Sequence, residues 1–288
     1  ARNLAVIMEL PLVVLDVQRG GPATGLPTKS EQTDLLQALF GRNGESPMPV
    51  IAATSPTDCF DAAYAASKMA LEHMTPVILM TDAYVANGSA AFKLPNLADY
   101  PAINPPVIDK CEGAFKPFER DPESFARKWA FPGKAGLEHR VGGLEKTTAG
   151  VISSDPENHA KMVAERAEKV ARLANYLPEQ QVIGDEDADV LIVGWGGTFG
   201  HLYTALHELR EEGKKVALCH FDFINPLPKN TADIFARYRK IIVCELNSGQ
   251  FADYLRAKLP QFNYLQYNKV QGQPFIVKEI VDAVNAIL

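Results

Sequence analysis

The sequence predicts an α/β protein with two domains. Strand-like apolar runs alternate with helical segments in both halves of the chain, which is typical of parallel α/β sheets. Several predicted helices begin at a capping side chain that is followed by a proline. The chain has 288 residues, of which 47% are hydrophobic and 22% are charged. This composition supplies enough apolar material for two cores of ordinary domain size.

Three strands and a capped helix are predicted in the first half. The strands are expected at Leu12 to Val17, Pro49 to Ala53 and Pro76 to Thr81. Between the last two, Ser55-Pro56-Thr57-Asp58 predicts a helix that runs to about Glu72. Leu4 to Leu10 is typical of the tail of a helix, but no capping residue precedes it. Because Ala1 is also not a methionine, we expect an N-terminal portion before this segment.

The regular pattern dissolves between Phe92 and Ser154, where prolines and glycines interrupt any period. A stretch of this length without regular structure is unusual inside a compact domain. We therefore expect an arm that wraps over a neighbouring surface or subunit. The predicted first domain covers residues 1–154, including the arm at 92–154, and the predicted second domain covers residues 155–288.

The second half begins with a helix at Asp155-Pro156-Glu157, where a cap again precedes a proline. Its apolar face is formed by Val163, Ala167, Val170, Ala174 and Leu177. An α/β unit follows. Its strands are expected at Val190 to Val193, Lys215 to Leu218, Ile241 to Cys244 and, more weakly, Tyr264 to Tyr267. Its helices are expected at about Gly200 to Glu212, Gly249 to Leu259 and Pro274 to Leu288.

Charge and cysteine content restrict the class of partner. The formal net charge of −6 argues against binding to nucleic acid or to an anionic membrane surface, so proteins and small molecules are the expected partners. The cysteines are scattered, with no Cys-x-x-Cys pair and no nearby histidine at metal-ligand spacing, so no zinc or iron-sulfur site is expected within this chain. Scattered thiols suit a reducing cytoplasm, and no apolar stretch approaches membrane-spanning length. We therefore expect a cytoplasmic protein.

The loop after the first strand is the strongest candidate for a binding site. Asp16 to Thr28 surrounds one arginine with glycines, prolines and threonines. Arg19 offers a planar fork of donors that matches a carboxylate, and the glycines beside it allow backbone amides to approach a ligand. In open α/β sheets, ligands commonly bind at the carboxyl ends of strands. The structural alternative is a rigid crossover in which Arg19 pairs with Asp16 or Glu31.

Two other loops follow strands in the second half. Gly194 to Gly200 lacks the third glycine of a dinucleotide-binding fingerprint, because Phe199 stands at that position. We expect a tight turn with Thr198 as the helix cap; an anion site for a partner's ligand is the alternative. Glu245 to Gln250 is expected to cap a helix, or alternatively to face a subunit interface.

A longer pattern extends from the Arg19 loop. Asp16 to Thr28 continues as Lys29-Ser30-Glu31-Gln32 and then as Leu39 to Pro47. This combination resembles the alpha subunit of thiamine-dependent 2-oxoacid:ferredoxin oxidoreductases, in particular the 2-oxoglutarate type. Further segments similar to this family are Ser55 to Phe60, Thr75 to Asp82, Ala86 to Ser89, Gly136 to His139, Asp155 to His159, Val193 to Gly196, Asn225 to Pro228, Glu245 to Gln250 and Val270 to Phe275.

The resemblance implies an incomplete thiamine-binding domain of the pyrimidine type, followed by a transketolase C-terminal-like α/β domain. The implied activity is the oxidative decarboxylation of 2-oxoglutarate with coenzyme A, which yields succinyl-CoA, carbon dioxide and reduced ferredoxin. A separate beta subunit is expected to hold most of the thiamine diphosphate site, the Mg²⁺ and a 4Fe-4S cluster. The chain alone is therefore expected to be inactive, with the beta subunit and ferredoxin as partners.

Two substrate-binding positions of the family transfer to Arg19 and Thr28, which we expect to contact the 2-oxoacid. No catalytic residue, cofactor contact or metal ligand transfers. Ala23 replaces a serine that most members carry, and a Tyr-Pro-Ile-Thr-Pro segment with its upstream glutamate would have to lie before Ala1. The alternatives are a sister enzyme for pyruvate or branched-chain 2-oxoacids, and a non-catalytic scaffold subunit.

Overall fold

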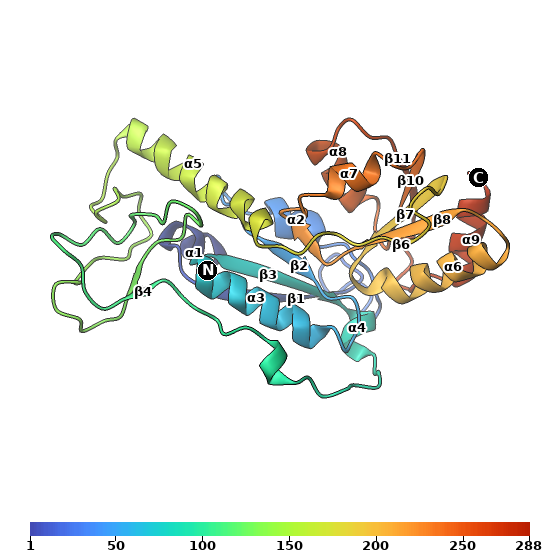
Figure 1. The fold of residues 1–288 in the computed structure, drawn as a ribbon, viewed down its shortest axis with the longest axis horizontal. Coiled ribbons are helices and arrows are strands. Elements are labelled where there is room, and N and C mark those ends of the chain that lie inside the picture. The colour runs from blue at the N-terminus through green and yellow to red at the C-terminus, as the bar shows by residue number, and fades with distance from the viewer.

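The computed structural model describes residues 1–288 and contains two main β-sheets flanked by helices (Figure 1). The first sheet has the order β1-β3-β2-β9. Its strands are β1 (Leu12–Gln18), β3 (Pro76–Asp82), β2 (Val50–Ala52) and β9 (Phe223–Asn225). The first three are parallel, whereas β9 runs antiparallel to β2. Because β9 comes from the second half of the chain, both halves build this sheet.

Helices cover both faces of the first sheet. They are α1 (Arg2–Met8), α2 (Leu35–Phe40), α3 (Cys59–His73), α4 (Ala83–Asn87) and α5 (Pro156–Arg172), which the short η2 (Leu173–Asn175) follows. Side chains alternate along each strand, so Ile51 and Leu79 pack with α3 and the end of α5, while Val50 and Ile78 pack with α1 and α2. Burial on both faces explains why β3 is apolar at nearly every position.

The second sheet has the order β11-β10-β7-β8-β6 and is parallel except for β6. Its strands are β6 (Ile183–Gly184), β7 (Val190–Trp195), β8 (Val216–Phe221), β10 (Lys240–Glu245) and β11 (Tyr264–Asn268). Its helices are α6 (Phe199–Glu211), preceded by η3 (Gly196–Thr198), then α7 (Thr231–Phe235), α8 (Gln250–Lys258) and α9 (Val277–Asn285). One face packs on α6 and α9, and the other packs on α7 and α8.

One hydrophobic core joins the two sheets. Leu35 of α2 and Val50 of β2 belong to the same buried cluster as Trp195, Phe221 and Phe251 of the second half. The aromatic rings of Phe221 and Phe251 meet edge to face, with centroids 5.3 Å apart. The two α/β units therefore share apolar burial and are not connected by a linker alone.

The two-sheet α/β architecture confirms the predicted fold class, and every predicted strand is present with small shifts at its ends. Two predicted helix starts were wrong. Helix α3 begins at Cys59 because Ser55 forms a separate turn, in which its hydroxyl accepts the backbone N–H of Asp58 at 3.1 Å. Helix α9 begins at Val277 rather than at Pro274, because the Glu279 carboxylate accepts the N–H of Ile276 at 2.9 Å.

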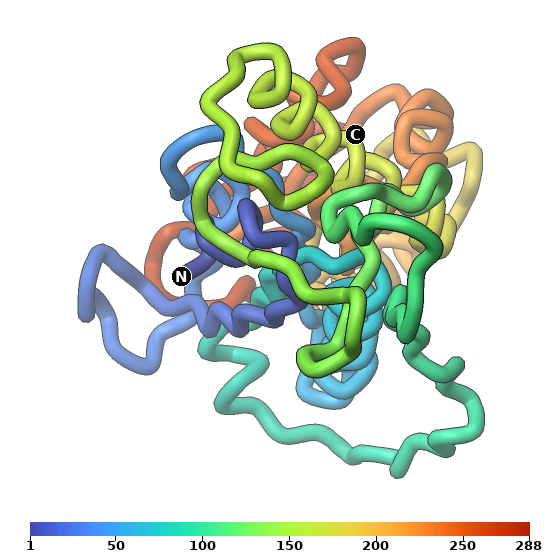
Figure 2. Tube along the Cα trace, turned by 90° about the vertical axis from the view of Figure 1, so that its left-hand side faces the viewer, coloured from blue at the N-terminus to red at the C-terminus, as the bar shows by residue number.

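The proline-rich stretch from Phe92 to Ser154 has little regular structure and lies over α1, α3 and α5. It contains η1 (Leu97–Asp99) and a two-stranded sheet of β4 (Val107–Ile108) and β5 (Trp129–Ala130). Figure 2 shows the part between α4 and β4 as an open loop at the edge of the molecule. That loop returns to α3, where the Tyr64 hydroxyl donates to the Pro101 carbonyl.

A buried cluster of charges fastens this stretch to α1 and α5. Glu9, at the end of α1, has no exposed side-chain surface and receives charged hydrogen bonds from Arg120 and from Lys169 of α5, each at 2.6 Å. The guanidinium of Arg127 donates to the Glu9 carbonyl at 2.9 Å. The single carboxylate therefore connects α1, the irregular stretch and α5.

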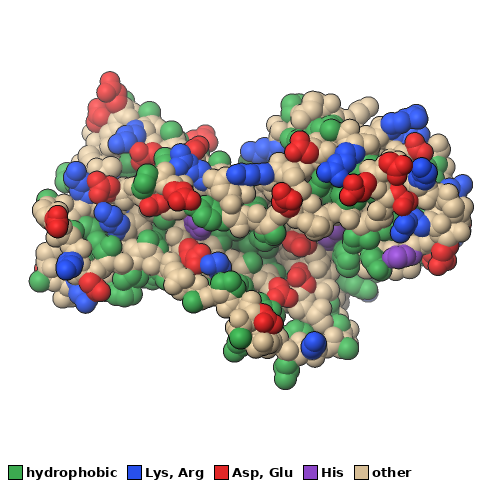
Figure 3. Space-filling view, viewed as in Figure 1, with side chains coloured by type: hydrophobic (Ala, Val, Ile, Leu, Met, Phe, Trp, Pro, Cys, Tyr) green, Lys and Arg blue, Asp and Glu red, His purple; other side chains and the backbone are tan.

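No helix is both long enough and apolar enough to cross a bilayer. On the face drawn in Figure 3, acidic and basic side chains are interspersed over both lobes. That distribution agrees with the modest net charge and provides no patch of a single sign on this face.

Candidate functional site

The loop that follows β1 is closed at its neck by backbone hydrogen bonds. The N–H of Gly20 donates to the Lys29 carbonyl at 3.0 Å, and the N–H of Leu26 donates to the Gly20 carbonyl at 2.8 Å. Arg19 and Thr28 each directly precede one partner of the first bond. The structure therefore brings both predicted site residues to the same end of the loop, and both side chains are exposed.

Arg19 takes part in no salt bridge, so the structural alternative, in which it pairs with Asp16 or Glu31, does not form. Asp16 instead lies near Asp34 and Arg2, and burial and Asp34 raise its pKa. The guanidinium of Arg19 is consequently available to an anion from outside the chain.

The loop backbone is held in an uncommon conformation. Ala23 and Thr28 have φ values of 52° and 63°, in the left-handed region that residues with a Cβ rarely adopt. At Gly25, with φ 43°, a Cβ would collide with the carbonyl group of Gly20. Strain of this kind persists only where the surroundings fix the backbone, and it is frequent at ligand sites.

Gln18 attaches the two ends of the loop to the first sheet, and sequence reasoning missed it. Its side chain is buried, donates to the Thr81 carbonyl of β3 at 3.2 Å and accepts the N–H of Asp34 at 3.1 Å. The signal that could have found it is a polar residue at the last position of an apolar strand, where a buried amide requires partners.

Gln32 attaches the returning limb of the loop to the second domain. Its side chain donates to the Trp195 carbonyl at 2.7 Å and accepts the N–H of Leu246 at 3.1 Å. Its own carbonyl accepts the side-chain amide of Asn247 at 2.7 Å. The Arg19 loop therefore rests on both domains.

Glu245 confirms the predicted capping role of the Glu245 to Gln250 segment. Its carboxylate is fully buried and accepts the N–H groups of Phe251 and Ala252 at 2.8 and 3.0 Å, at the start of α8. Trp195 and Asn247 donate side-chain bonds to the same group. No cation pairs with it, and burial raises its pKa despite these bonds.

Replacing Glu245 with alanine is expected to lower the free energy of unfolding by about 2 kcal/mol, because buried N–H donors lose their acceptor. Urea denaturation of the purified protein would measure this loss. Glu208→Ala, at an exposed position of α6, is the matched control and is expected to change stability by less than about 0.5 kcal/mol. Equal stability of Glu245→Ala and wild type would contradict the capping assignment.

The Gly194 to Gly200 segment differs from the prediction in its cap. Thr198 does not cap α6, because its hydroxyl turns back and donates to the Trp195 carbonyl at 2.8 Å. Asp82 of β3 lies against Gly197 and accepts its N–H, and it also accepts the N–H groups of Tyr84 and Val85 at 2.8 and 3.0 Å. The carboxylate of Asp82 thus occupies the turn at Gly197, where the alternative prediction was an anion site for a partner's ligand.

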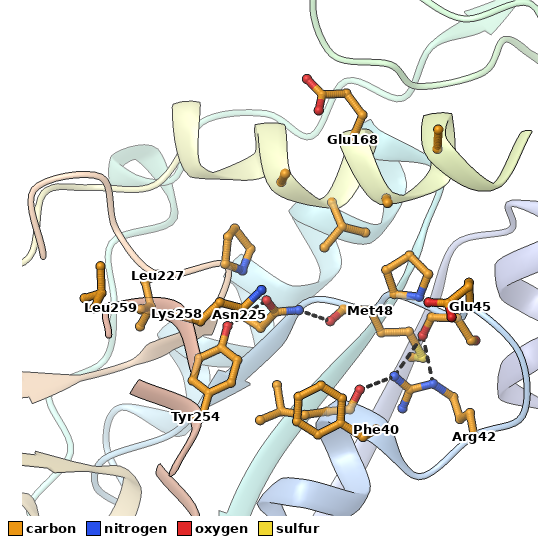
Figure 4. Close-up of a pocket in the computed structure, with 18 of the residues that line it drawn as sticks. Phe40, Arg42, Glu45, Met48, Glu168, Asn225, Leu227, Tyr254, Lys258 and Leu259 are labelled. Carbon is orange, nitrogen blue, oxygen red and sulfur yellow. Dashed lines mark hydrogen bonds between the residues drawn. The ribbon is translucent and has the colours of Figure 1, made fainter. Parts of the chain in front are cut away.

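A large groove is distinct from the Arg19 loop. It has a volume of about 1010 Å³ and lies between α5, the segment after α2 and the end of α8 (Figure 4). Two of its polar side chains bind backbone carbonyls: Asn225 donates to the Met48 carbonyl at 2.7 Å, and Arg42 donates to the Ser46 carbonyl at 3.0 Å. Neither Arg19 nor Thr28 lines it, so cavity size does not identify the anion site.

The chain also contains no group of three or more His, Cys, Asp or Glu side chains placed to hold a metal ion. Cys219 and Cys244 are buried, and Cys59 and Cys111 are partly buried. The chemistry available from the chain's own site is therefore the recognition of an anion by a guanidinium, a hydroxyl and backbone amides.

Comparison with known families decides the classification. Residues 3–157 match the family described as pyruvate flavodoxin/ferredoxin oxidoreductase, thiamine diphosphate-binding. The chain belongs to the pyruvate flavodoxin/ferredoxin oxidoreductase family. Residues 188–280 match core domain II of pyruvate:ferredoxin oxidoreductase, so both α/β units have counterparts in this family.

Named members of the oxidoreductase family extend this assignment. The chain is 44% identical over 290 residues to the 2-oxoglutarate oxidoreductase subunit KorA of Mycobacterium tuberculosis, covering 100% of the chain and 44% of that protein. It is 32% identical to the alpha subunit of 2-oxoacid:ferredoxin oxidoreductase 1 of Aeropyrum pernix, covering 96% of the chain and 44% of the relative. The chain therefore spans a little under half the length of these curated relatives.

A solved structure matches the fold of nearly the whole chain. The 2-oxoglutarate:ferredoxin oxidoreductase of Magnetococcus marinus, with 2-oxoglutarate, coenzyme A and succinyl-CoA bound, superposes with a TM-score of 0.92 at 32% identity. The match covers 99% of this chain and 50% of that chain. Within the oxidoreductase family, the two-domain arrangement described above is thus shared with an enzyme that binds a 2-oxoacid.

Proposed function

We propose that this chain forms the core of the alpha subunit of a 2-oxoglutarate:ferredoxin oxidoreductase. The observation that carries the proposal is its similarity, along 99% of its length, to a structure that holds 2-oxoglutarate and coenzyme A. The unpaired Arg19 and the neighbouring Thr28 support it, because they provide charged and neutral donors at the carboxyl end of a parallel strand. The sister enzymes for pyruvate or branched-chain 2-oxoacids would use the same donors for the carboxylate that all 2-oxoacids share.

In this proposal Arg19 and Thr28 bind and orient the substrate. The guanidinium forms paired hydrogen bonds to a carboxylate, and the Thr28 hydroxyl donates a further bond from the other side of the loop neck. The strained backbone fixes both groups before the substrate arrives, which lowers the entropic cost of binding. The reaction converts 2-oxoglutarate and coenzyme A into succinyl-CoA, carbon dioxide and one proton, and the two electrons released pass to oxidised ferredoxin.

Thiamine diphosphate would supply the electron sink for decarboxylation when it is bound. The chain's own residues fit the substrate carboxylate, but no cluster of acids, histidines or cysteines fits the Mg²⁺ of the diphosphate or an iron-sulfur cluster. From the resemblance to the oxidoreductase family, we propose that a partner beta subunit holds Mg²⁺, the 4Fe-4S cluster and most of the thiamine diphosphate site, with ferredoxin as the electron acceptor. A cytoplasmic location agrees with such a cluster and with reduced cysteines.

A substrate panel on the assembled enzyme tests this function. With coenzyme A and ferredoxin present, we expect kcat/KM for 2-oxoglutarate to exceed that for pyruvate or a branched-chain 2-oxoacid by roughly tenfold or more, since the second carboxylate adds one charged interaction. Reduction of ferredoxin, followed by its absorbance, gives the rates. The opposite order of substrates would identify a sister enzyme. Turnover that is unaffected by Arg19→Ala, with weaker subunit association, would indicate a scaffold subunit.

A further inference from the structure

We propose that Glu31 is a positioning residue, which holds the Arg19 and Thr28 loop in its binding conformation by fastening it to Gly272 of the second domain. The inference rests on the proposed function, because it concerns the geometry of the same site. It assigns a role to a buried carboxylate that the substrate chemistry itself does not use.

Burial changes abruptly along the loop. Residues 21–29 are all exposed, whereas Ser30, Glu31 and Gln32 have 6%, 5% and 0% of their surface exposed. Glu31 takes part in no salt bridge, although carboxylates are rarely buried without a cation. Residues 30–32, which form the return limb of the loop, are therefore anchored in the protein interior. Glu31 is the charged residue among them.

The partner of this carboxylate is a backbone group of the second domain. Glu31 Oε1 accepts the N–H of Gly272 at 3.0 Å. On the other side, the Glu31 carboxyl group packs beneath Gly20: a Cβ placed there would lie 3.4 Å from Glu31 Cδ. Glu31 thus lies between the residue next to Arg19 and the turn that contains Gly272.

Gly272 also touches the returning part of the loop directly. It has φ 66°, and a Cβ at this position would lie 2.7 Å from Leu26 Cδ1 and 3.1 Å from Lys29 Cβ. Lys29 directly follows Thr28. One glycine therefore contacts the limb that carries Thr28 and, through Glu31, supports the limb that carries Arg19.

The turn around Gly272 is itself held by buried hydrogen bonds. The ammonium of Lys269 is buried and donates to the Pro274 carbonyl at 3.0 Å and to the Glu279 carboxylate at 2.8 and 2.9 Å. The N–H of Lys269 donates to the carbonyl of Glu245 at the end of β10. Because the turn is fixed to the second sheet, a contact between the turn and the Arg19 loop fixes the position of the loop relative to that sheet.

Two conservative variants separate the hydrogen bond from the charge. Glu31→Gln keeps an oxygen that can accept the N–H of Gly272 but removes the charge, whereas Glu31→Asp keeps the charge but is too short to reach. In the assembled enzyme we expect Glu31→Asp to raise the KM for 2-oxoglutarate about tenfold while kcat changes less than about twofold. Glu31→Gln is expected to resemble wild type in both constants.

Gln250→Ala is the matched control for the domain contact. Gln250 joins the same two domains, since it donates to the Thr33 carbonyl at 2.8 Å and accepts the N–H of Leu36 at 3.0 Å, but it does not touch the exposed loop. We expect an unchanged KM in this variant. Hydrogen exchange, measured by mass spectrometry, is expected to accelerate in residues 19–30 of Glu31→Asp only.

Three results would overturn the proposal. In the first, Glu31→Asp shows wild-type KM and exchange. In the second, Glu31→Gln is impaired and Glu31→Asp is not, so that the charge matters and the bond does not. In the third, Gln250→Ala shows the same rise in KM, as a general loosening of the domains would produce. Failure of the proposed function is distinguishable, because Arg19→Lys would then also leave the KM for 2-oxoglutarate unchanged.

Discussion

Arg19→Lys in the assembled enzyme is expected to raise the KM for 2-oxoglutarate at least about tenfold, and Arg19→Ala is expected to lower kcat/KM by about a hundredfold, the equivalent of about 3 kcal/mol. A lysine ammonium keeps the charge but cannot form two parallel bonds to one carboxylate. The alanine variant loses both the charge and the geometry. Neither substitution is expected to change the unfolding transition, since the side chain is exposed and takes part in no ion pair.

Steady-state kinetics over a range of 2-oxoglutarate concentrations measures both effects. Arg239→Lys is the matched control, because Arg239 is another exposed arginine. It directly precedes β10, has 80% of its side chain accessible and lies 3.9 Å from the exposed Asp189. We expect wild-type constants for it. If Arg19→Ala retained wild-type KM and kcat, the assignment of Arg19 to the substrate would be wrong.

Glu9→Ala is expected to cause the largest loss of stability, about 3–5 kcal/mol. The substitution leaves Lys169 buried without a carboxylate and leaves Arg120 with Glu165 alone, and Arg127 lies beside them. Three cations, Arg120, Arg127 and Lys169, face the carboxylates of Glu9 and Glu165. Burial, with smaller effects of Arg120 and Arg127, lowers the pKa of Lys169 to about 8 even with Glu9 present. Removing the acid intensifies this repulsion and releases the irregular stretch from α1 and α5.

Urea denaturation compares this variant with Glu168→Ala. Glu168 also forms an ion pair on α5, with Arg172 at 2.7 Å, but 49% of its side chain is exposed. Exposed pairs contribute little, so we expect a change below about 0.5 kcal/mol. Similar losses in the two variants would show that burial of the Glu9 cluster has no special effect.

The Glu9 cluster also predicts that the free energy of unfolding depends on pH in the acid range. Burial alone would raise the pKa of Glu9, but Lys169 and Arg120 lower it from 4.5 to about 2. Because the folded value lies below the unfolded one, Glu9 stabilises the fold fully above pH 4.5 and loses this contribution as the pH falls toward 2. Over that interval the free energy of unfolding of Glu9→Gln is expected to change less than that of wild type.

Local features of the fold could be predicted from the sequence. Asp155 caps α5 as predicted, accepting the N–H of Asn158 at 2.8 Å, because the cap and the helix lie within four residues. The cap at Glu245 was predicted for the same reason. Strand β9 was missed because three residues carry no period, and its place is decided by pairing with β2 from the other half of the chain.

Part of the candidate site could likewise be predicted from the sequence, and part of it could not. The composition of the loop indicates an anion site at Arg19 and Thr28, since its donors and glycines are adjacent in sequence. Glu31 and Gln32 appear only as polar residues before a helix. Their partners, Gly272 and Leu246, lie 241 and 214 positions away, and only the tertiary structure reveals them.

The contact between Glu31 and Gly272 also bears on the order in which the protein matures. During synthesis the Arg19 loop leaves the ribosome long before the turn that contains Gly272, and α9 follows that turn. Since closing so long a chain segment is slow, the loop acquires its final support among the last steps of folding. A chain that stalls or is cleaved before Gly272 would lack the contact to Glu31. Under the proposed function, such a chain would present Arg19 on an unsupported loop, so a binding-competent site would form only once the second sheet is complete.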